Sequence, residues 1–229
     1  MLYRLFAFLA LFCILAVPAW ADFEIGRRAY ENKDWIRAIT ELRPLAEKGD
    51  PRALVILGHM YNDGNGVIKD PTRAVEHYIK AAAQDHVEAV IAMGAMAQSG
   101  LGLQQNTHLA NVWFERAAKL GDARGMFLTA ITYMHGDKTG KTAFHANLPQ
   151  AYKWFLLAHQ TADDPKIRRA AQEMAEGVGG QLRGIDITAT KKLVADFTPT
   201  EPGGLGPLPS AEALPKPNQQ KDLTETPKP

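Results

Sequence analysis

The sequence predicts an all-α protein, built as an α/α solenoid (superhelix) of stacked helix pairs. The main observation is that residues 53–82 recur as residues 89–118 at a fixed offset of 36 positions. Such periodicity is typical of repeat arrays, in which each unit buries its apolar face against its neighbours. Apolar residues also recur at helical spacing, and no segment shows the convincing alternation of a β-strand. The matched positions are Gly58 and Gly94, Gly64 and Gly100, Gly66 and Gly102, Tyr78 and Phe114, and Ala81-Ala82 and Ala117-Ala118.

Residues 1–21 have the features of a secretory signal peptide. An apolar run of thirteen residues follows Arg4, and a small-x-small sequence ends at Ala21. Cleavage there would make Asp22 the mature N-terminus, and we expect a periplasmic or secreted protein. An uncleaved anchor is the alternative. Because the apolar run is shorter than the ~20 residues that span a bilayer, we expect no stable membrane span after cleavage.

The composition argues against two classes of site. Cys13, the only cysteine, lies inside the predicted signal peptide, so the mature chain has no thiol for a disulfide, a nucleophile or a metal. The 26 basic residues nearly balance the 25 acidic ones and do not cluster, so nothing indicates a nucleic-acid partner.

Residues 22–197 divide into helical units. In the first unit, residues 22–50, a polar break separates two short helices. In the second unit, residues 51–86, the sequence predicts a helix over 51–63 followed by a loop that contains glycines. A second helix then begins, with Asp70 as its N-cap and Pro71 as its first residue. Gly58 lies inside the first of these helices. A glycine that recurs at such a position indicates the close approach of a neighbouring helix.

Two further units, residues 87–122 and 123–163, follow the same pattern, and the second has five extra residues after Gly136. We expect residues 164–197 to cap the solenoid. Within residues 164–197 the sequence predicts two helices, over 165–177 and 187–197. Asp186 is the expected N-cap residue of the second helix. Large aromatic residues recur on the second helix of each unit, and we expect them to pack between units. They are Tyr78, Trp113, Phe114, Trp154 and Phe155.

Residues 198–229 form a proline-rich tail. They hold eight of the 14 prolines of the chain and no aromatic residue, and their only β-branched residues are four threonines. A segment of this composition cannot bury enough apolar surface to offset its conformational entropy, so we expect disorder. A polyproline ligand for a partner is the alternative.

Residues 53–82 match almost in full the pattern A-x-x-x-L-G-x-x-Y-x-x-G-x-G-V-x-x-D-x-x-x-A-x-x-x-Y-x-x-A-A. They therefore resemble the Sel1-like repeat, a relative of the tetratricopeptide repeat. Residues 87–122 and 123–158 resemble it with small departures, whereas residues 22–50 resemble a degenerate tetratricopeptide unit. The resemblance, which is to exported bacterial-type members, implies a superhelix whose first helices line a concave groove. It also implies a non-catalytic scaffold that binds a protein or peptide in the cell envelope.

The groove positions are the first-helix residues that packing between units does not use. The candidates for partner binding are Arg27, Tyr30, Arg52, His59, Asn62, Asp63, Gln98, Phe127, Ile131 and His135, with Glu88 and Arg124 on the same face. They are polar near the first units and apolar near the last, which would suit an extended peptide with an apolar end. The alternative is that they are merely solvated, with Phe127 and Ile131 packed on the capping helix. We expect a monomer.

No set of residues predicts catalysis. The histidines form no H-x-x-x-H pair, neither serine lies in a G-x-S-x-G or S-x-x-K sequence, and residues 136–142 lack the spacing of a phosphate-binding loop. We therefore expect no cofactor, metal or enzymatic activity. Some exported relatives bind or hydrolyse β-lactams, so a protein that binds or hydrolyses cell-wall material (peptidoglycan or β-lactam) is the alternative. Those relatives are cysteine-rich, and this chain lacks their disulfide pattern.

Overall fold

The protein is an array of helices. The computed structural model describes residues 19–137 and 144–208, and within these ranges it contains helices and no strand. Consecutive helices pack on one another, except that the last helix packs on the helix two before it. The helices are α2 (Ala19–Glu31), α3 (Trp35–Glu47), α4 (Pro51–Asp63), α5 (Pro71–Ala82), α6 (Val87–Ser99), α7 (Thr107–Lys119), α8 (Ala123–His135), α9 (Leu148–Thr161), α10 (Pro165–Gly179) and α11 (Gly184–Ala195).

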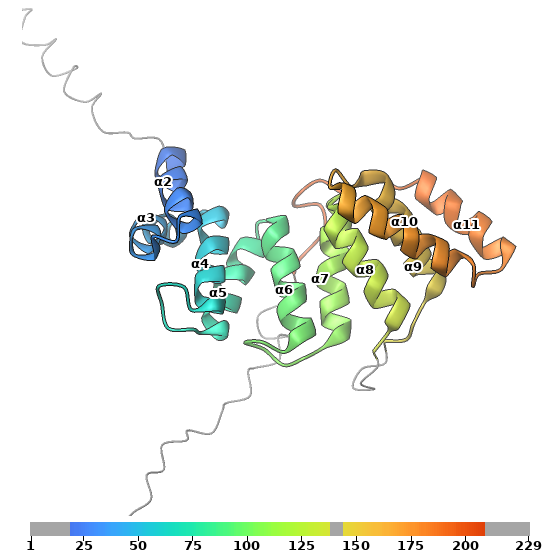
Figure 1. Ribbon diagram of the computed structural model, residues 1–229, viewed down its shortest axis with the longest axis horizontal. Helices are drawn as coiled ribbons and strands as arrows, with labels where there is room; N and C mark the ends of the chain where they lie inside the picture. The colour runs from blue at the N-terminus through green and yellow to red at the C-terminus, as the bar shows by residue number, and fades with distance from the viewer. Residues whose placement is uncertain (1–18, 138–143, 209–229) are drawn as a thin grey trace, which may run out of the picture.

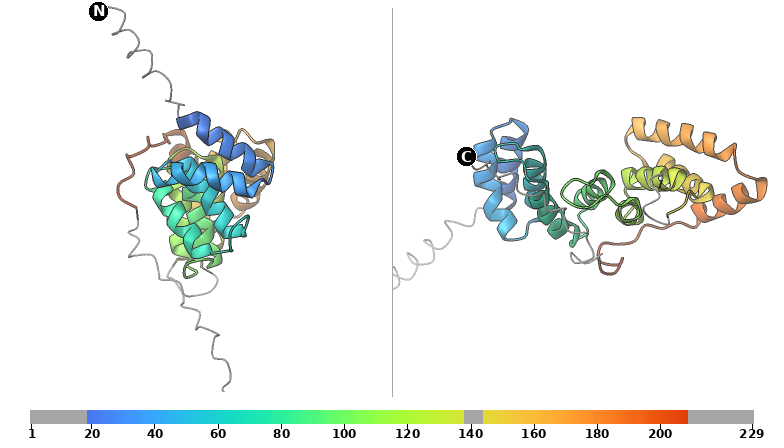
Figure 2. Two further views of the ribbon diagram at one scale, coloured as in Figure 1. Left: turned by 90° about the vertical axis from the view of Figure 1, so that its left-hand side faces the viewer. Right: turned by 90° about the horizontal axis from the view of Figure 1, so that it is seen from below.

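The helix pairs follow one another along the long axis of the molecule. Figure 1 shows α2 and α3 at one end and α10 and α11 at the other. Viewed from that first end, the pairs lie behind one another (Figure 2). The prediction of an all-α solenoid is confirmed. Within the described ranges, no helix combines the length and apolarity that crossing a bilayer requires.

The helix boundaries follow from local chemistry. The Asp50 carboxylate accepts hydrogen bonds from the backbone N–H groups of Arg52 and Ala53 at the start of α4. Asn106 caps α7 in the same way, through the N–H of Leu109. These side chains pair the N–H groups that a helix leaves without a partner at its start. At the other end of α4, Gly64 takes a left-handed conformation with a φ of +81°, which favours glycine.

A repeated glycine lets the two helices of a unit approach closely. A Cβ atom added at Gly58 would lie 2.4 Å from Cε1 of Tyr78, and one added at Gly94 would lie 2.4 Å from Cε1 of Phe114. Both distances are far below van der Waals contact, so each aromatic ring rests directly on the glycine backbone. The close approach expected at Gly58 is confirmed.

The core consists of two clusters that meet inside α7. The first cluster runs from Phe23 to Ala117, and the second runs from Ala118 to Val194. The predicted aromatic residues lie in these clusters, each at most 2% exposed: Tyr78, Trp113, Phe114, Trp154 and Phe155. Their burial in the core is confirmed, and Tyr78 and Phe114 pack on a glycine of their own unit.

The structure differs from the sequence-based expectations at both ends of the solenoid. The last helix, α11, begins at Gly184, so Asp186 lies in its first turn and Arg183 is the N-cap residue. The N-cap assignment to Asp186 is therefore wrong, although an acidic residue in the first turn still favours the helix electrostatically. At the other end, α2 begins at Ala19, before the predicted cleavage point. Cleavage after Ala21 stays a prediction.

The first part of the proline-rich tail lies against the solenoid. The N–H of Thr200 donates to the backbone oxygen of Lys119 at 2.7 Å, and Leu208 packs against the first core cluster. Figure 1 shows the segment after α11 returning behind α7. Residues 198–208 thus have defined contacts, which differs from the expected disorder. Residues 209–229, like residues 1–18 and residues 138–143 of the lengthened loop after Gly136, lie outside the described residues.

Candidate partner-binding face

The candidate site is the first-helix face, which lies on α2, α4, α6 and α8. We define it by the predicted polar groove positions: Arg27, Tyr30, Arg52, His59, Asn62, Asp63, Glu88, Gln98, Arg124 and His135. Three arginines on this face pair mainly with acids of their own helix or its cap. Arg27 lies 2.7 Å from Glu24, Arg52 lies 2.7 Å from Asp50, and Arg124 lies 3.1 Å from Asp122. Their charge is therefore largely neutralised by acidic residues nearby in the sequence.

Glu88 links three successive helices of this face. One of its carboxylate oxygens lies 3.9 Å from Nε2 of His59 on α4, and the other lies 3.9 Å from Nη1 of Arg124 on α8. Both distances are at the limit of an ion pair, and the Glu88 side chain is about half exposed. Glu88 thus keeps most of its capacity to accept hydrogen bonds.

His59 is held in place by a residue that the sequence assigns to the core. Its Nδ1 atom lies 2.9 Å from the hydroxyl oxygen of Tyr78, and the two rings meet edge to face. Burial lowers the pKa of His59 and raises the pKa of Tyr78 well above its usual value. No pattern in the sequence predicts this pair, because it joins side chains nineteen positions apart on different helices.

Asp63 lies at the exposed end of α4 and has one amide partner. Its carboxylate accepts a hydrogen bond of 2.8 Å from Nδ2 of Asn62. The other side-chain atom of that amide, Oδ1 of Asn62, is buried and has no hydrogen-bond partner. Nearby, burial raises the pKa of the half-buried Tyr30, and the charges of Asp63 and Glu88 raise it further. Tyr30, Asp63 and Glu88 therefore share one acidic neighbourhood.

The remaining predicted residues do not join this group. Phe127 and Ile131 are partly buried and pack against the second core cluster, and the Phe127 ring meets Phe155 edge to face. Gln98 and His135 are exposed. The structure therefore brings together the candidate residues on α2 and α4. The apolar candidates on α8 pack in the core instead.

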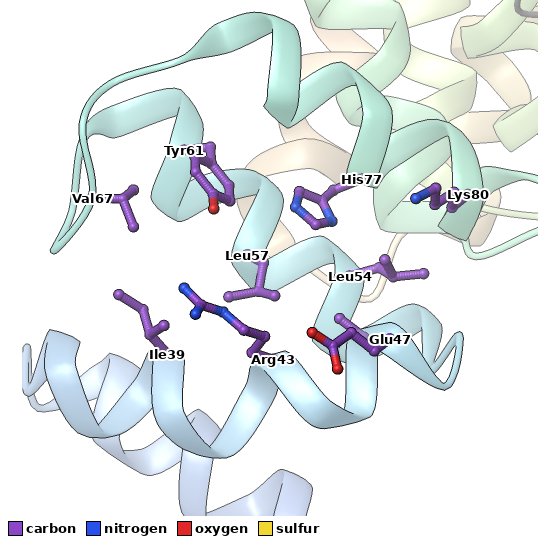
Figure 3. Close-up of a pocket in the computed structure, with 10 residues that line it drawn as sticks. Ile39, Arg43, Glu47, Leu54, Leu57, Tyr61, Val67, His77 and Lys80 are labelled. Carbon is purple, nitrogen blue, oxygen red and sulfur yellow. The ribbon is translucent and has the colours of Figure 1, made fainter.

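A separate pocket lies between α3, α4 and α5. Its volume is about 230 Å³, and its lining includes Arg43 from α3 and His77 and Lys80 from α5 (Figure 3). Leu54, Leu57 and Tyr61 line it from the side of α4 opposite the first-helix face. The pocket was not predicted, because it depends on how three helices pack. Among the described residues, no group of three or more His, Cys, Asp or Glu side chains is placed to hold a metal ion.

We predict that acidification from pH 7.5 to pH 5.5 lowers the free energy of unfolding. Burial lowers the pKa values of His59, His77 and His86 from their usual 6.5. The unfolded chain therefore binds protons at these sites at a higher pH than the folded protein does. The stabilisation is full above pH 6.5 and is lost as the pH falls below it. Urea unfolding at the two pH values measures the change.

The variant His59→Gln isolates one of these histidines. Glutamine can still hydrogen-bond to Tyr78 but does not titrate, so we expect a smaller loss of stability on acidification than in the parent protein. An equal loss in both proteins would contradict the assignment of this effect to His59.

Comparison with known proteins identifies the repeat. The model of the Sel1 family, described as Sel1 repeat, matches residues 51–86, 87–122 and 123–158. These ranges correspond to the helix pairs α4 and α5, α6 and α7, and α8 and α9, the last pair without the C-terminal end of α9. The unit boundaries are those at which Asp50, His86 and Asp122 precede the first helices.

Curated relatives share part of this chain. It is 31% identical over 84 residues to the ERAD-associated E3 ubiquitin-protein ligase component HRD3B of Arabidopsis thaliana, covering 37% of this chain and 14% of the relative. It is 32% identical over 162 residues to chitin synthase regulatory factor 3 of Schizosaccharomyces pombe, covering 69% of this chain and 17% of the relative. The chain thus spans less than a fifth of the length of either relative.

A solved structure has the same fold. The crystal structure of a Sel1 repeat protein from Oxalobacter formigenes superposes with a TM-score of 0.54 at 24% identity, covering 62% of this chain and 55% of the other. The repeat match and this similarity of fold agree with the packing of α4 to α9. The chain carries three consecutive Sel1 repeats and is a Sel1-repeat protein.

Proposed function

We propose that the protein is an interaction scaffold that binds an extended segment of a partner protein across the first-helix face. The family supports this proposal, because Sel1 repeats are typical of proteins that bind other proteins. The names of the curated relatives are consistent with it, since one is a ligase component and the other a regulatory factor.

One observation carries the choice of surface. Asp63 and Glu88 are the acidic residues of this face without a close ion pair among the described residues, whereas the arginines beside them have acidic partners. A surface with free acceptors favours a ligand that supplies donors. We infer that the partner segment carries lysine or arginine side chains.

We also propose that the scaffold works in the cell envelope of a bacterium. The support is the sequence of residues 1–21, with its short apolar run and its small residues before Asp22. N-terminal sequencing of the protein from an extracytoplasmic fraction tests this. A sequence that starts at Asp22 supports export, and an intact N-terminus in the cytoplasmic fraction contradicts it.

Charge reversal tests the binding surface. We predict that the double variant Asp63→Lys/Glu88→Lys loses at least about tenfold in affinity for its partner, since repulsion replaces attraction and tenfold corresponds to about 1.4 kcal/mol. Both side chains are exposed, so the fold should be retained. Partners are recovered from envelope extract on immobilised protein and their affinity is then measured individually.

The matched control is Asp163→Lys/Glu173→Lys. It makes the same change in charge at exposed positions around α10, at the far end of the solenoid. We expect this control to retain the partners that the Asp63→Lys/Glu88→Lys variant loses. Equal recovery by both variants would count against the first-helix face.

A further inference from the structure

Residues 198–208 follow the row of turns that connect one repeat to the next. Pro199 packs on Gly121 in the turn between α7 and α8, where an added Cβ atom would lie 3.2 Å from the proline Cβ. Further on, the N–H of Gly203 donates to Oδ2 of Asp85, in the turn between α5 and α6, at 2.5 Å. The segment therefore contacts two successive turns, one repeat apart.

Asp85 and Arg116 hold the middle of this segment. The Arg116 guanidinium contacts Oδ1 of Asp85 through Nη2 at 2.7 Å and Nε at 2.8 Å. Its Nη1 atom donates to the backbone oxygen of Gly206 at 3.1 Å and reaches that of Leu205 at 3.5 Å. The pair thus offers one acceptor to a backbone N–H and donors to two backbone carbonyls. It recognises main-chain atoms of a segment that turns at residues 202–205, where the N–H of Gly204 donates to the backbone oxygen of Glu201 at 3.0 Å.

Asp85 departs from the repeat at this position. The residues one repeat away on either side are Gly49 and Gly121, with φ values of +86° and +90°. Asp85 takes a φ of +54°, a left-handed conformation that glycine adopts more readily. The backbone of the turn therefore does not require an aspartate. Its side chain is 4% exposed, and the partners that it contacts are Arg116 and the tail.

The side chains of the tail find apolar contacts beside this pair. Leu205 and Pro207 line a cavity of about 260 Å³ with Val112 and Trp113 of α7. The buried Nε1 atom of Trp113 has no hydrogen-bond partner. Since Leu208 packs on the first core cluster, the segment is held by apolar contacts as well as by main-chain hydrogen bonds.

We propose that Asp85 and Arg116 form a second peptide-binding site, distinct from the first-helix face, for a turn-forming segment rich in glycine and proline. Its resident ligand is residues 199–208 of the same chain. Recognition requires a glycine N–H at the Asp85 carboxylate, as at Gly203, and carbonyl oxygens at Arg116.

Hydrogen exchange on the full chain tests the site. We expect the amides of residues 198–208 to exchange at least tenfold faster in Asp85→Gly than in the parent protein, with the helices unchanged. Glycine is the residue found at this position one repeat earlier and one repeat later, so the turn should still form. The control Asp163→Gly makes the same change at an exposed position and should leave the tail protected. Unchanged protection in Asp85→Gly would overturn the proposal.

A synthetic peptide tests recognition in trans. The full-chain variant Gly203→Pro lacks the N–H that meets Asp85 and cannot adopt the φ of +85°, so its own tail is released. We expect the peptide of residues 198–208 to bind this variant saturably, and to bind at least tenfold more weakly when Asp85→Gly is added. Equal binding to both variants would overturn the site. Tail protection that disappears on dilution of the parent protein would show that a second copy supplies the segment, and would overturn the assignment to the same chain.

Discussion

Replacing Gly94 with alanine is expected to destabilise the protein by about 1–3 kcal/mol, the usual cost of forcing extra atoms into a packed core. Helix propensity alone favours the opposite result, since alanine is better than glycine by up to about 1 kcal/mol inside a helix. The close contact decides the sign. The new Cβ atom would lie 2.4 Å from Cε1 and 2.5 Å from Cδ1 of Phe114, which is 1% exposed and cannot move freely. Urea unfolding measures the change.

Two further variants separate packing from propensity. Gly177 lies near the end of α10, is exposed, and has no atom within 4 Å of an added Cβ. Gly177→Ala should therefore stabilise the protein by about 0.4–1 kcal/mol. The double variant Gly94→Ala/Phe114→Leu should be more stable than the two separate effects predict, because the smaller side chain leaves room for the methyl group. If Gly94→Ala stabilised the protein as Gly177→Ala does, the close-contact argument would be refuted.

Replacing Arg116 with alanine is expected to cost about 3–5 kcal/mol, the typical penalty for removing one partner of a buried ion pair. The side chains of Arg116 and Asp85 are 13% and 4% exposed. Without the guanidinium, the Asp85 carboxylate would keep the N–H of Gly203 as its hydrogen-bond donor but would have no countercharge. Calorimetry or denaturant unfolding of the full chain measures the loss.

Removing the carboxylate as well should recover most of that loss. In Asp85→Gly/Arg116→Ala no charge is left buried, and the residue at the positive φ becomes a glycine, as in the two neighbouring turns. We expect the double variant to be more stable than Arg116→Ala alone. A double variant that is less stable than Arg116→Ala would show that the cost has another origin.

Much of the fold could be predicted because a repeat encodes it more than once. Gly58 and Gly94 each predict a helix contact, and the structure places an aromatic ring on both. Proline after Asp50 and Asp70 predicts helix starts that the structure contains. The last helix was misplaced by three residues, because α11 has no side-chain hydrogen bond at its N-cap and lies outside the repeat.

The contacts of the tail could not be predicted from composition. Composition describes the average behaviour of a segment, whereas residues 198–208 are held by particular donors and acceptors, such as the Gly203 N–H and the Asp85 carboxylate. One signal was present in the sequence. Asp85 occupies the position that Gly49 and Gly121 occupy in the neighbouring units. A charged residue at such a glycine position indicates that the side chain has a role other than forming the turn.

The candidate face was predictable in part. Helical spacing places His59 and Asp63 on one side of α4, and the structure brings Tyr30 and Glu88 near them. The spacing could not show that Phe127 faces the second core cluster, because this depends on how α9 and α10 pack around α8. Nor could it show which carboxylates are left without close partners.

The hydrogen bond between Gly203 and Asp85 joins residues 118 positions apart and changes how the array unfolds. In a solenoid each repeat contacts only its neighbours, so unfolding can start at one end and proceed unit by unit. Here the segment that follows α11 contacts the turn between α5 and α6, which makes part of the array a closed loop. Local unfolding that starts at α11 must also break the contacts between the segment after α11 and the turn between α5 and α6. Conversely, loss of those contacts makes α11 easier to unfold. The C-terminal half is therefore expected to melt as one cooperative block.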